Sequence, residues 1–187
     1  MGVESRGTIA EAEFLGEIID PEKLASKEKK LKERLGWLTQ DQLMDNVKEF
    51  QPGNPSDPEK QFPGDIFALI AEKITPDDYD RLRYYTAVTR KEDIVLKSRL
   101  DYCEGVDFFF EFDSEEGVVK VTCDFALFEK SETDFKADVL AVIPDEDMNP
   151  KDDPKLWEST TKKIAEDIIW NIKERIKEIK KKKEERP

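Results

Sequence analysis

Two aspartates, Asp107 and Asp124, are the residues of this sequence whose type and spacing point most directly to chemistry. They lie in two segments, 105–113 and 118–128, that alternate apolar and polar residues as half-buried strands do. If these segments close into a hairpin around the turn 114–117, the numbers of every cross-strand pair sum to 231. That register sets Asp107 opposite Asp124 on one face, where two like charges repel each other.

A divalent metal ion is the simplest charge that would offset this repulsion. Mg²⁺ and Mn²⁺ prefer oxygen ligands, and Mg²⁺ is commonly held by one or two carboxylates and several waters. Glu111 on the same face, or Glu11 from the first predicted helix, could complete the ligand shell. Three alternatives stay open: a neighbouring Lys or Arg, a carboxyl group with a raised pKa, or a solvated polar face without any ligand.

The residue types that are scarce narrow the chemistry. The chain has no His and only two cysteines, Cys103 and Cys123, without CxxC spacing. This excludes His-based catalytic triads, His general bases and zinc-finger sites. The hairpin register places Cys123 on the apolar face, where we expect a buried and inert thiol. Catalysis would therefore depend on carboxylates, Lys, Tyr, Ser, Thr or Cys.

The first 50 residues are predicted to be helical. Thr8 and Thr39 each begin a capping-box pattern, with Glu or Gln three positions later. Asp20 followed by Pro21 is typical of a helix N-terminus, and the apolar spacing after it predicts a helix over 21–36. These signals place several helices before any strand.

The segment 51–64 contains four prolines and predicts a loop. After it, the apolar periodicity predicts a helix over 65–74, and Thr75 followed by Pro76 predicts a second helix that continues through Tyr85. Residues 89–104 have no dominant pattern. The sequence therefore predicts two helices after the loop and leaves the structure of residues 89–104 open.

One more strand and a long helix are predicted after the hairpin. The strand lies within 137–144, which is rich in β-branched and apolar residues. Asp153 and Pro154 then form a helix start. The apolar residues after it have spacings of 7, 4, 4, 4 and 3 and predict a helix of up to about 28 residues: Trp157, Ile164, Ile168, Ile172, Ile176 and Ile179. We expect its apolar face to pack on the hairpin phenylalanines and its last turn, from Lys180, to fray.

The hairpin, with helices before it and a strand and helix after it, resembles the core of the PD-(D/E)XK restriction-endonuclease-like superfamily. The resemblance covers about residues 65–143 and implies that Asp107 and Asp124 hold the catalytic metal ion. In that family a lysine two residues after the second acid lies beside the attacking water, and here this position is Ala126. Lys120, on the same face, and Lys130, just beyond the strand, are the candidates to replace it.

These observations predict one α+β domain: a helical N-terminal region at 1–50, a Pro-rich loop at 51–64, and an α+β core with the C-terminal helix at 65–187. The sheet is expected to have three or four strands, mostly antiparallel. A restriction-endonuclease-like core is the expectation that the resemblance adds.

Charge is distributed unevenly along the chain. The net charge is −13, yet residues 151–187 hold 12 Lys and Arg against 9 Asp and Glu, compared with 19 against 35 in the rest. An acidic body repels a phosphate backbone at long range, although a local basic face can still hold nucleic acid.

Two functions are consistent with the sequence. The first is a nuclease that hydrolyses phosphodiesters with Mg²⁺ or Mn²⁺, or an inactive relative of one. The second is a non-catalytic interaction module whose acidic body binds a protein partner. The chain has no run of about 20 apolar residues, as a membrane span requires, and no signal peptide, so we expect a cytoplasmic protein.

Overall fold

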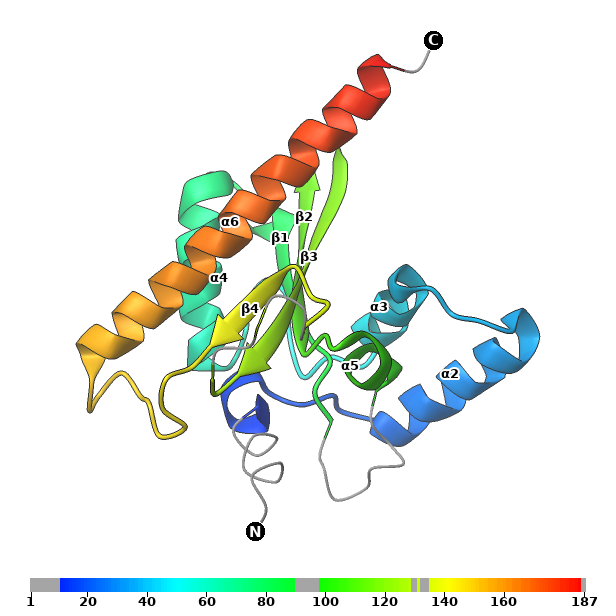
Figure 1. Cartoon of the computed structure of the whole chain (residues 1–187), viewed down its shortest axis with the longest axis horizontal. Helices are drawn as coiled ribbons and strands as arrows, with labels where there is room; N and C mark the ends of the chain where they lie inside the picture. Colours follow the sequence, from blue (N-terminus) through cyan, green and yellow to red (C-terminus); the bar gives the residue numbers. More distant parts are fainter. Residues whose placement is uncertain (1–10, 90–97, 129–130, 132–134, 186–187) are drawn as a thin grey trace.

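A mixed four-stranded sheet lies at the centre of the structure, a computed structural model that describes residues 11–89, 98–128, 131 and 135–185. In spatial order the strands are β1 (Leu82–Thr86), β2 (Phe108–Ser114), β3 (Gly117–Ala126) and β4 (Val139–Val142). The first three form an antiparallel meander, and β4 runs parallel to β3. Helices cover both faces of this sheet (Figure 1). The predicted α+β class, with a mostly antiparallel sheet, is confirmed.

The β2–β3 hairpin has the register that the sequence predicts. Its pairs run from Phe108 opposite Cys123 to Ser114 opposite Gly117, and their numbers all sum to 231. The turn is tighter than expected, because the strands continue until only Glu115 and Glu116 remain between them. Gly117 has a φ of 130°, a conformation that residues with a Cβ rarely adopt.

The regular pairing of β2 with β3 ends at Phe108, the residue that follows Asp107 in the chain, so Asp107 lies just outside the regular ladder. The backbone N–H of Asp107 donates to the carbonyl of Cys123 at 2.9 Å, so the sum of 231 no longer holds there. Val106 consequently lies with Phe109 on the second face and not with the other hairpin residues of the first face, as the sequence predicted. The interruption turns Asp107 away from a simple cross-strand position.

The first face carries the larger hydrophobic core. The phenylalanines of β2, Phe108, Phe110 and Phe112, pack there with α4 (Gln61–Ile74) and with α6 (Pro154–Glu184). This confirms the predicted packing of the C-terminal helix. That helix has 31 residues and extends through the lysines that were expected to fray. Within the described ranges, no helix is both long and apolar enough to cross a membrane.

The second face is also covered. A separate cluster joins Phe109 and Tyr85 of the sheet to buried side chains of α2 (Pro21–Leu35), α3 (Gln40–Lys48) and α5 (Arg99–Glu104). The capping box at Thr39 is present, and it fixes the start of α3. The predicted N-terminal helices, together with α5, therefore bury the face that carries Phe109 and Glu111, and this face is not a solvated surface.

Two boundaries before the hairpin differ from the prediction. Helix α4 begins at Gln61, inside the segment expected to be a loop, because Pro63 lies in its first turn, where no backbone donor is needed. Thr75 ends that helix and does not start another one. A single 3₁₀ turn, η1 (Tyr79–Arg81), then leads into β1, so the predicted helix through Tyr85 is wrong. Pairing with β2 overrides the local capping signal.

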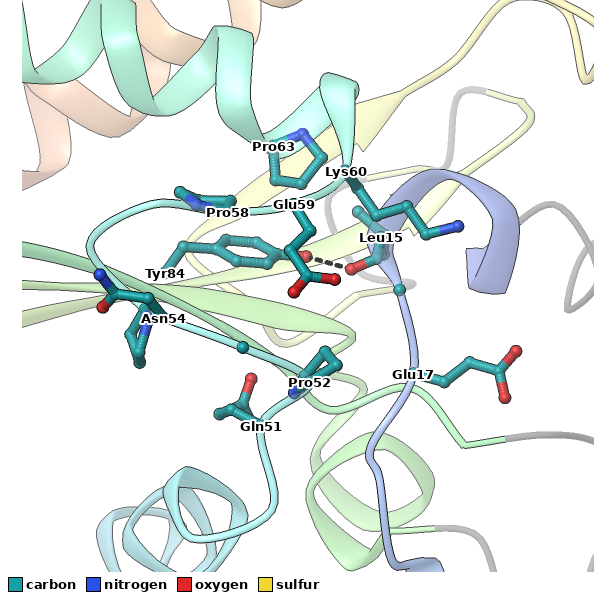
Figure 2. Close-up of a pocket in the computed structure, with 13 residues that line it drawn as sticks. Leu15, Glu17, Gln51, Pro52, Asn54, Pro58, Glu59, Lys60, Pro63 and Tyr84 are labelled. Carbon is teal, nitrogen blue, oxygen red and sulfur yellow. Dashed lines mark hydrogen bonds between the residues drawn. The ribbon is translucent and has the colours of Figure 1, made fainter.

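The Pro-rich loop protects the free edge of β1. The carbonyl of Pro55 accepts from the backbone N–H of Tyr84 at 2.8 Å, and the Gln51 amide bonds both the N–H and the carbonyl of Thr86 at 2.8 and 2.9 Å. The Tyr84 hydroxyl donates to the carbonyl of Leu15 at 2.9 Å under the same loop (Figure 2). Proline-rich cover of this kind prevents an edge strand from pairing with another chain.

The Gln51 bridge yields a test of this edge cover. Gln51→Ala removes both side-chain bonds to Thr86. The N–H and the carbonyl of Thr86, which are partly buried, then lose these protein partners. We expect it to lower the free energy of unfolding by about 1–3 kcal/mol, measured by urea denaturation. Gln61→Ala, at an exposed position of α4, is the matched control, with an expected change within about 0.5 kcal/mol. Equal effects of the two substitutions would contradict the role of Gln51.

Candidate functional site

Asp107 is held rigidly between the two neighbouring strands. Its carbonyl accepts from the backbone N–H of Ala87 at 2.7 Å on the β1 side, and its N–H donates to Cys123 on the β3 side. Its carboxylate oxygen Oδ2 accepts from the backbone N–H of Phe125 at 2.7 Å. Only 5% of the residue is exposed. The backbone and one oxygen of the carboxylate are therefore fixed by the sheet.

Burial and neighbouring acids raise the pKa of Asp107 well above its usual value of 3.8. Burial is the largest cause, followed by the charges of Glu11 and Asp101 and, more weakly, Asp124, whereas the bond from the Phe125 N–H lowers the pKa. Glu11, Asp101 and Asp124 each have a further interaction partner. Three carboxyl groups from three other segments thus act on Asp107 at this end of the sheet.

Asp124 lies on β3, opposite Leu140 of the parallel strand β4, and is also buried, with 6% exposure. The neighbouring Cys123 is fully buried. Burial, with Asp138, Asp107 and Asp124 nearby, raises the pKa of the Cys123 thiol well above 9. This thiol therefore remains protonated and is a poor nucleophile.

Glu111, the third metal ligand predicted from the sequence, belongs to an ion-pair network. One of its oxygens accepts from Lys48 of α3, and the other accepts from Arg83 of β1 at 3.0 Å. Four residues of strand separate Glu111 from Asp107, which is about 13 Å. The structure does not bring Glu111 to the two aspartates; its charge attaches α3 to the sheet.

The two predicted lysines have different outcomes. Lys120 pairs with Asp41 at 3.0 Å and Asp45 at 3.4 Å on α3, and it too lies four residues along the strand from Asp124. It is not beside the aspartates because α3 supplies nearer negative charges. Lys130 lies outside the described residues. Ala126, at the position of the family lysine, is 6% exposed and pairs with Val142.

Asp101 is the member of the acidic group that the sequence prediction missed. It lies on α5, a helix of six residues in the stretch that had no dominant pattern. A signal was present: Ser98 and Asp101 have N-cap spacing, and the Ser98 hydroxyl accepts from the Asp101 N–H at 3.1 Å. Reading that cap would have placed Asp101 on a helix start next to the hairpin.

The oxygen chemistry of Asp107 and Asp124 fits a hard divalent cation. In the part of the chain that the structure describes, no group of three or more Asp, Glu or Cys side chains is arranged to hold an ion. Mg²⁺ nevertheless binds through one or two carboxylates, with water or phosphate oxygens as the remaining ligands. The two aspartates match that minimal set.

A second buried carboxyl group, Glu28 of α2, lies apart from this acidic group. It is 2% exposed; its oxygen Oε2 accepts from the backbone N–H of Arg99 at 3.3 Å, and Oε1 has no hydrogen-bond partner. Burial raises the pKa of Glu28 from its usual 4.5 to about 7, although the Arg99 N–H and charge oppose the shift. Glu28 caps the first turn of α5 and ties it to α2.

The raised pKa of Glu28 makes stability depend on pH. Between pH 4.5 and about 7 the folded chain keeps a proton that the unfolded chain loses, so the Glu28 contribution to stability falls as pH rises through this window. Glu28→Gln should remove that loss and be more stable than the wild type at pH 8, by up to about 3 kcal/mol. Urea denaturation at pH 5 and 8 measures the difference, and a difference that is the same at both pH values would refute it.

Comparisons with known proteins give no relative for this chain. No protein-family model matches it, and no match is found among the curated proteins or the solved structures. The assignment of a function therefore rests on the geometry and electrostatics of the chain itself.

Proposed function

We propose that this protein hydrolyses phosphodiester bonds with a divalent metal ion, Mg²⁺ or Mn²⁺, held by Asp107 and Asp124. One observation carries the proposal: Asp107 is a buried carboxyl group, fixed by a backbone bond, whose pKa is raised by burial and by three other acids. A group in such surroundings takes up positive charge readily, from a proton or from a cation. A buried carboxyl group with a perturbed pKa is typical of functional sites.

The backbone geometry around Asp107 favours the role of a metal ligand over that of a buried acid without a function. Asp107 and Asp124 lie on adjacent strands, and the break in pairing at Asp107 is the kind of local irregularity that redirects a side chain near an active site. The Phe125 N–H holds Oδ2 in one orientation, which lowers the entropy lost when a ligand binds. Both features prepare the site before any ion arrives.

When bound, the metal ion would polarise the phosphoryl oxygen and lower the pKa of a coordinated water. Asp107 and Asp124 would hold the ion as its protein ligands. The water oxygen would form a bond to phosphorus, the phosphorus–oxygen bond to the leaving group would break, and the leaving oxygen would take a proton from solvent. Because Ala126 stands in the place of the family lysine, the attacking water loses its proton to solvent, and we expect slow turnover.

The first test is the effect of metal on stability. Mg²⁺ or Mn²⁺ at about one hundred times its Kd should stabilise the wild type by about 2.7 kcal/mol, which corresponds to a rise in Tm of roughly 5–10 °C. Asp107→Asn and Asp124→Asn should abolish that rise. Without metal, Asp107→Asn should be as stable as the wild type or more stable, because it removes a buried charge among other acids.

The control is Asp77→Asn, an exposed aspartate in the turn before β1, at the opposite end of the sheet. Its metal-induced rise in Tm should equal that of the wild type. If the wild type shows no rise, or all three variants keep it, Asp107 and Asp124 do not bind the ion, and the acidic interaction module becomes the better explanation.

The second test is cleavage. The wild type with Mn²⁺ should cut single-stranded DNA slowly, and Asp107→Asn and Asp124→Asn should each reduce the rate at least about a hundredfold, because each removes a metal ligand. Gel assays with EDTA as the blank measure this. Cleavage that continues unchanged in both variants would overturn the assignment of the site, and a metal-binding wild type without cleavage would overturn the proposed activity.

A further inference from the structure

Helix α2 is basic in a protein that is strongly acidic overall. It holds six Lys and Arg against three Glu within Pro21–Leu35, whereas the whole chain has a net charge of −13. One of its three acids, Glu28, is buried and has a pKa near 7, so it carries only part of a negative charge at neutral pH. The helix therefore presents a local positive surface on an otherwise repulsive protein.

Four of these cations form a stripe along one side of the helix. Lys23, Lys27, Lys30 and Arg34 have spacings of four, three and four residues, which place side chains on the same face. The stripe is about 16 Å long, from the rise of 1.5 Å per residue. The buried residues Leu24 and Glu28 point elsewhere, toward α3 and α5.

The end of the stripe nearer the C-terminus of α2 lacks acidic partners. Lys23 pairs with Asp20 and Lys27 pairs with Glu49, both at 2.5 Å. Lys30 and Arg34 are exposed, and within the described residues neither has an ion pair. Their charges are thus available to an anion without breaking any contact in the fold.

An aromatic side chain lies directly after this open end. Gly36 ends α2 with a φ of 79°, a left-handed conformation that favours glycine, and its N–H donates to the Lys32 carbonyl at 2.8 Å. The turn buries Leu38, which is 4% exposed, and leaves Trp37 68% exposed. The connection between α2 and α3, at the end of a helical hairpin that projects from the sheet (Figure 1), therefore presents Trp37 to solvent three residues after Arg34 in the chain.

We propose that the stripe on α2 and Trp37 form a binding surface for single-stranded nucleic acid. Lys30 and Arg34 contact backbone phosphates, and Trp37 stacks on an unpaired base, the combination that single-strand-binding surfaces use. A membrane surface fits less well, because Leu24 and Leu31 of α2 pack in the cluster on the second face. The exposed apolar side chains at this end are Leu35 and Trp37, a small apolar area for entry into a bilayer. Base stacking also distinguishes an unpaired strand from a duplex, whose bases are already stacked.

This inference rests on the proposed function, for which it names the substrate class. The structure connects the two surfaces: Glu28 of α2 accepts from the Arg99 N–H of α5, and α5 also carries Asp101, one of the acids around Asp107. A strand held on α2 would be retained near a helix that borders the carboxylate site. Binding can be measured without metal, so its outcome is separate from that of the cleavage test.

The experiment measures binding of a fluorescent oligothymidylate to the full chain by anisotropy, with EDTA present and at about 0.05 M salt. Lys30→Ala combined with Arg34→Ala should weaken binding at least about tenfold and reduce the slope of log K against log salt by about 1.4. Trp37→Ala should weaken binding by about tenfold and leave that salt slope nearly unchanged.

The matched control is Lys180→Ala combined with Lys182→Ala, two exposed lysines on α6. It removes the same charge from a helix surface and should change the affinity by less than about twofold. Equal losses in the two double variants would overturn the proposal, because binding would then follow net charge alone. Equal affinity for duplex DNA, or binding only to vesicles that contain phosphatidylserine, would overturn it as well. A wild type that shows a metal-induced rise in Tm but no oligonucleotide binding would refute this surface and leave the metal site intact.

Discussion

The register of the β2–β3 hairpin is the constraint on which the rest of this structure depends. Phe108, Phe110 and Phe112 face α4 and α6, while Phe109 and Glu111 face the N-terminal helices. Because both faces are buried, a slip of one residue would place Glu111 in the larger core and three phenylalanines against ion pairs. The same register aligns Arg83, Glu111 and Lys120 across three strands, and α3 packs over that row. The hairpin thus positions both layers of helices.

The elements predicted best were those whose own residues specify them. The hairpin register, the capping box at Thr39 and the proline start of α6 depend on local chemistry, and all three are present. Strand β1 was missed because its edge is satisfied by Pro55 and Gln51 from a distant loop and both of its faces are buried, so no local alternation revealed it. Strand β1 is specified by partners that are distant in the sequence, and a single sequence does not reveal which residues these partners are.

The candidate site shows the same division. The predicted register placed Asp107 and Asp124 opposite each other on adjacent strands. It assumed that the regular ladder continues through Asp107, whereas the Asp107 N–H bonds the carbonyl of Cys123 and ends that ladder. Their position on the same predicted face also suggested that Glu111 and Lys120 lie near the aspartates. In the structure α3 contributes Asp41, Asp45 and Lys48 to that face, and these charges hold Glu111 and Lys120 in separate ion pairs. The alternation of apolar and polar residues along a strand does not show that a helix from another part of the chain neutralises the charges of Glu111 and Lys120.

The uneven charge of the chain gives the two proposed surfaces complementary roles. A net charge of −13 repels phosphate, and the acids around Asp107 add to that repulsion at the point where the proposed chemistry would occur. A cation at Asp107 and Asp124 would reverse the sign of that local field, so metal and substrate should bind in a coupled manner and not independently. Until the cation is present, a strand can be held only where the fold provides unpaired positive charge, and Lys30 and Arg34 of α2 provide it. Under the proposed function, an acidic protein would have to bind phosphate at two separate places, with anchoring by the cations of α2 and catalysis by the metal ion.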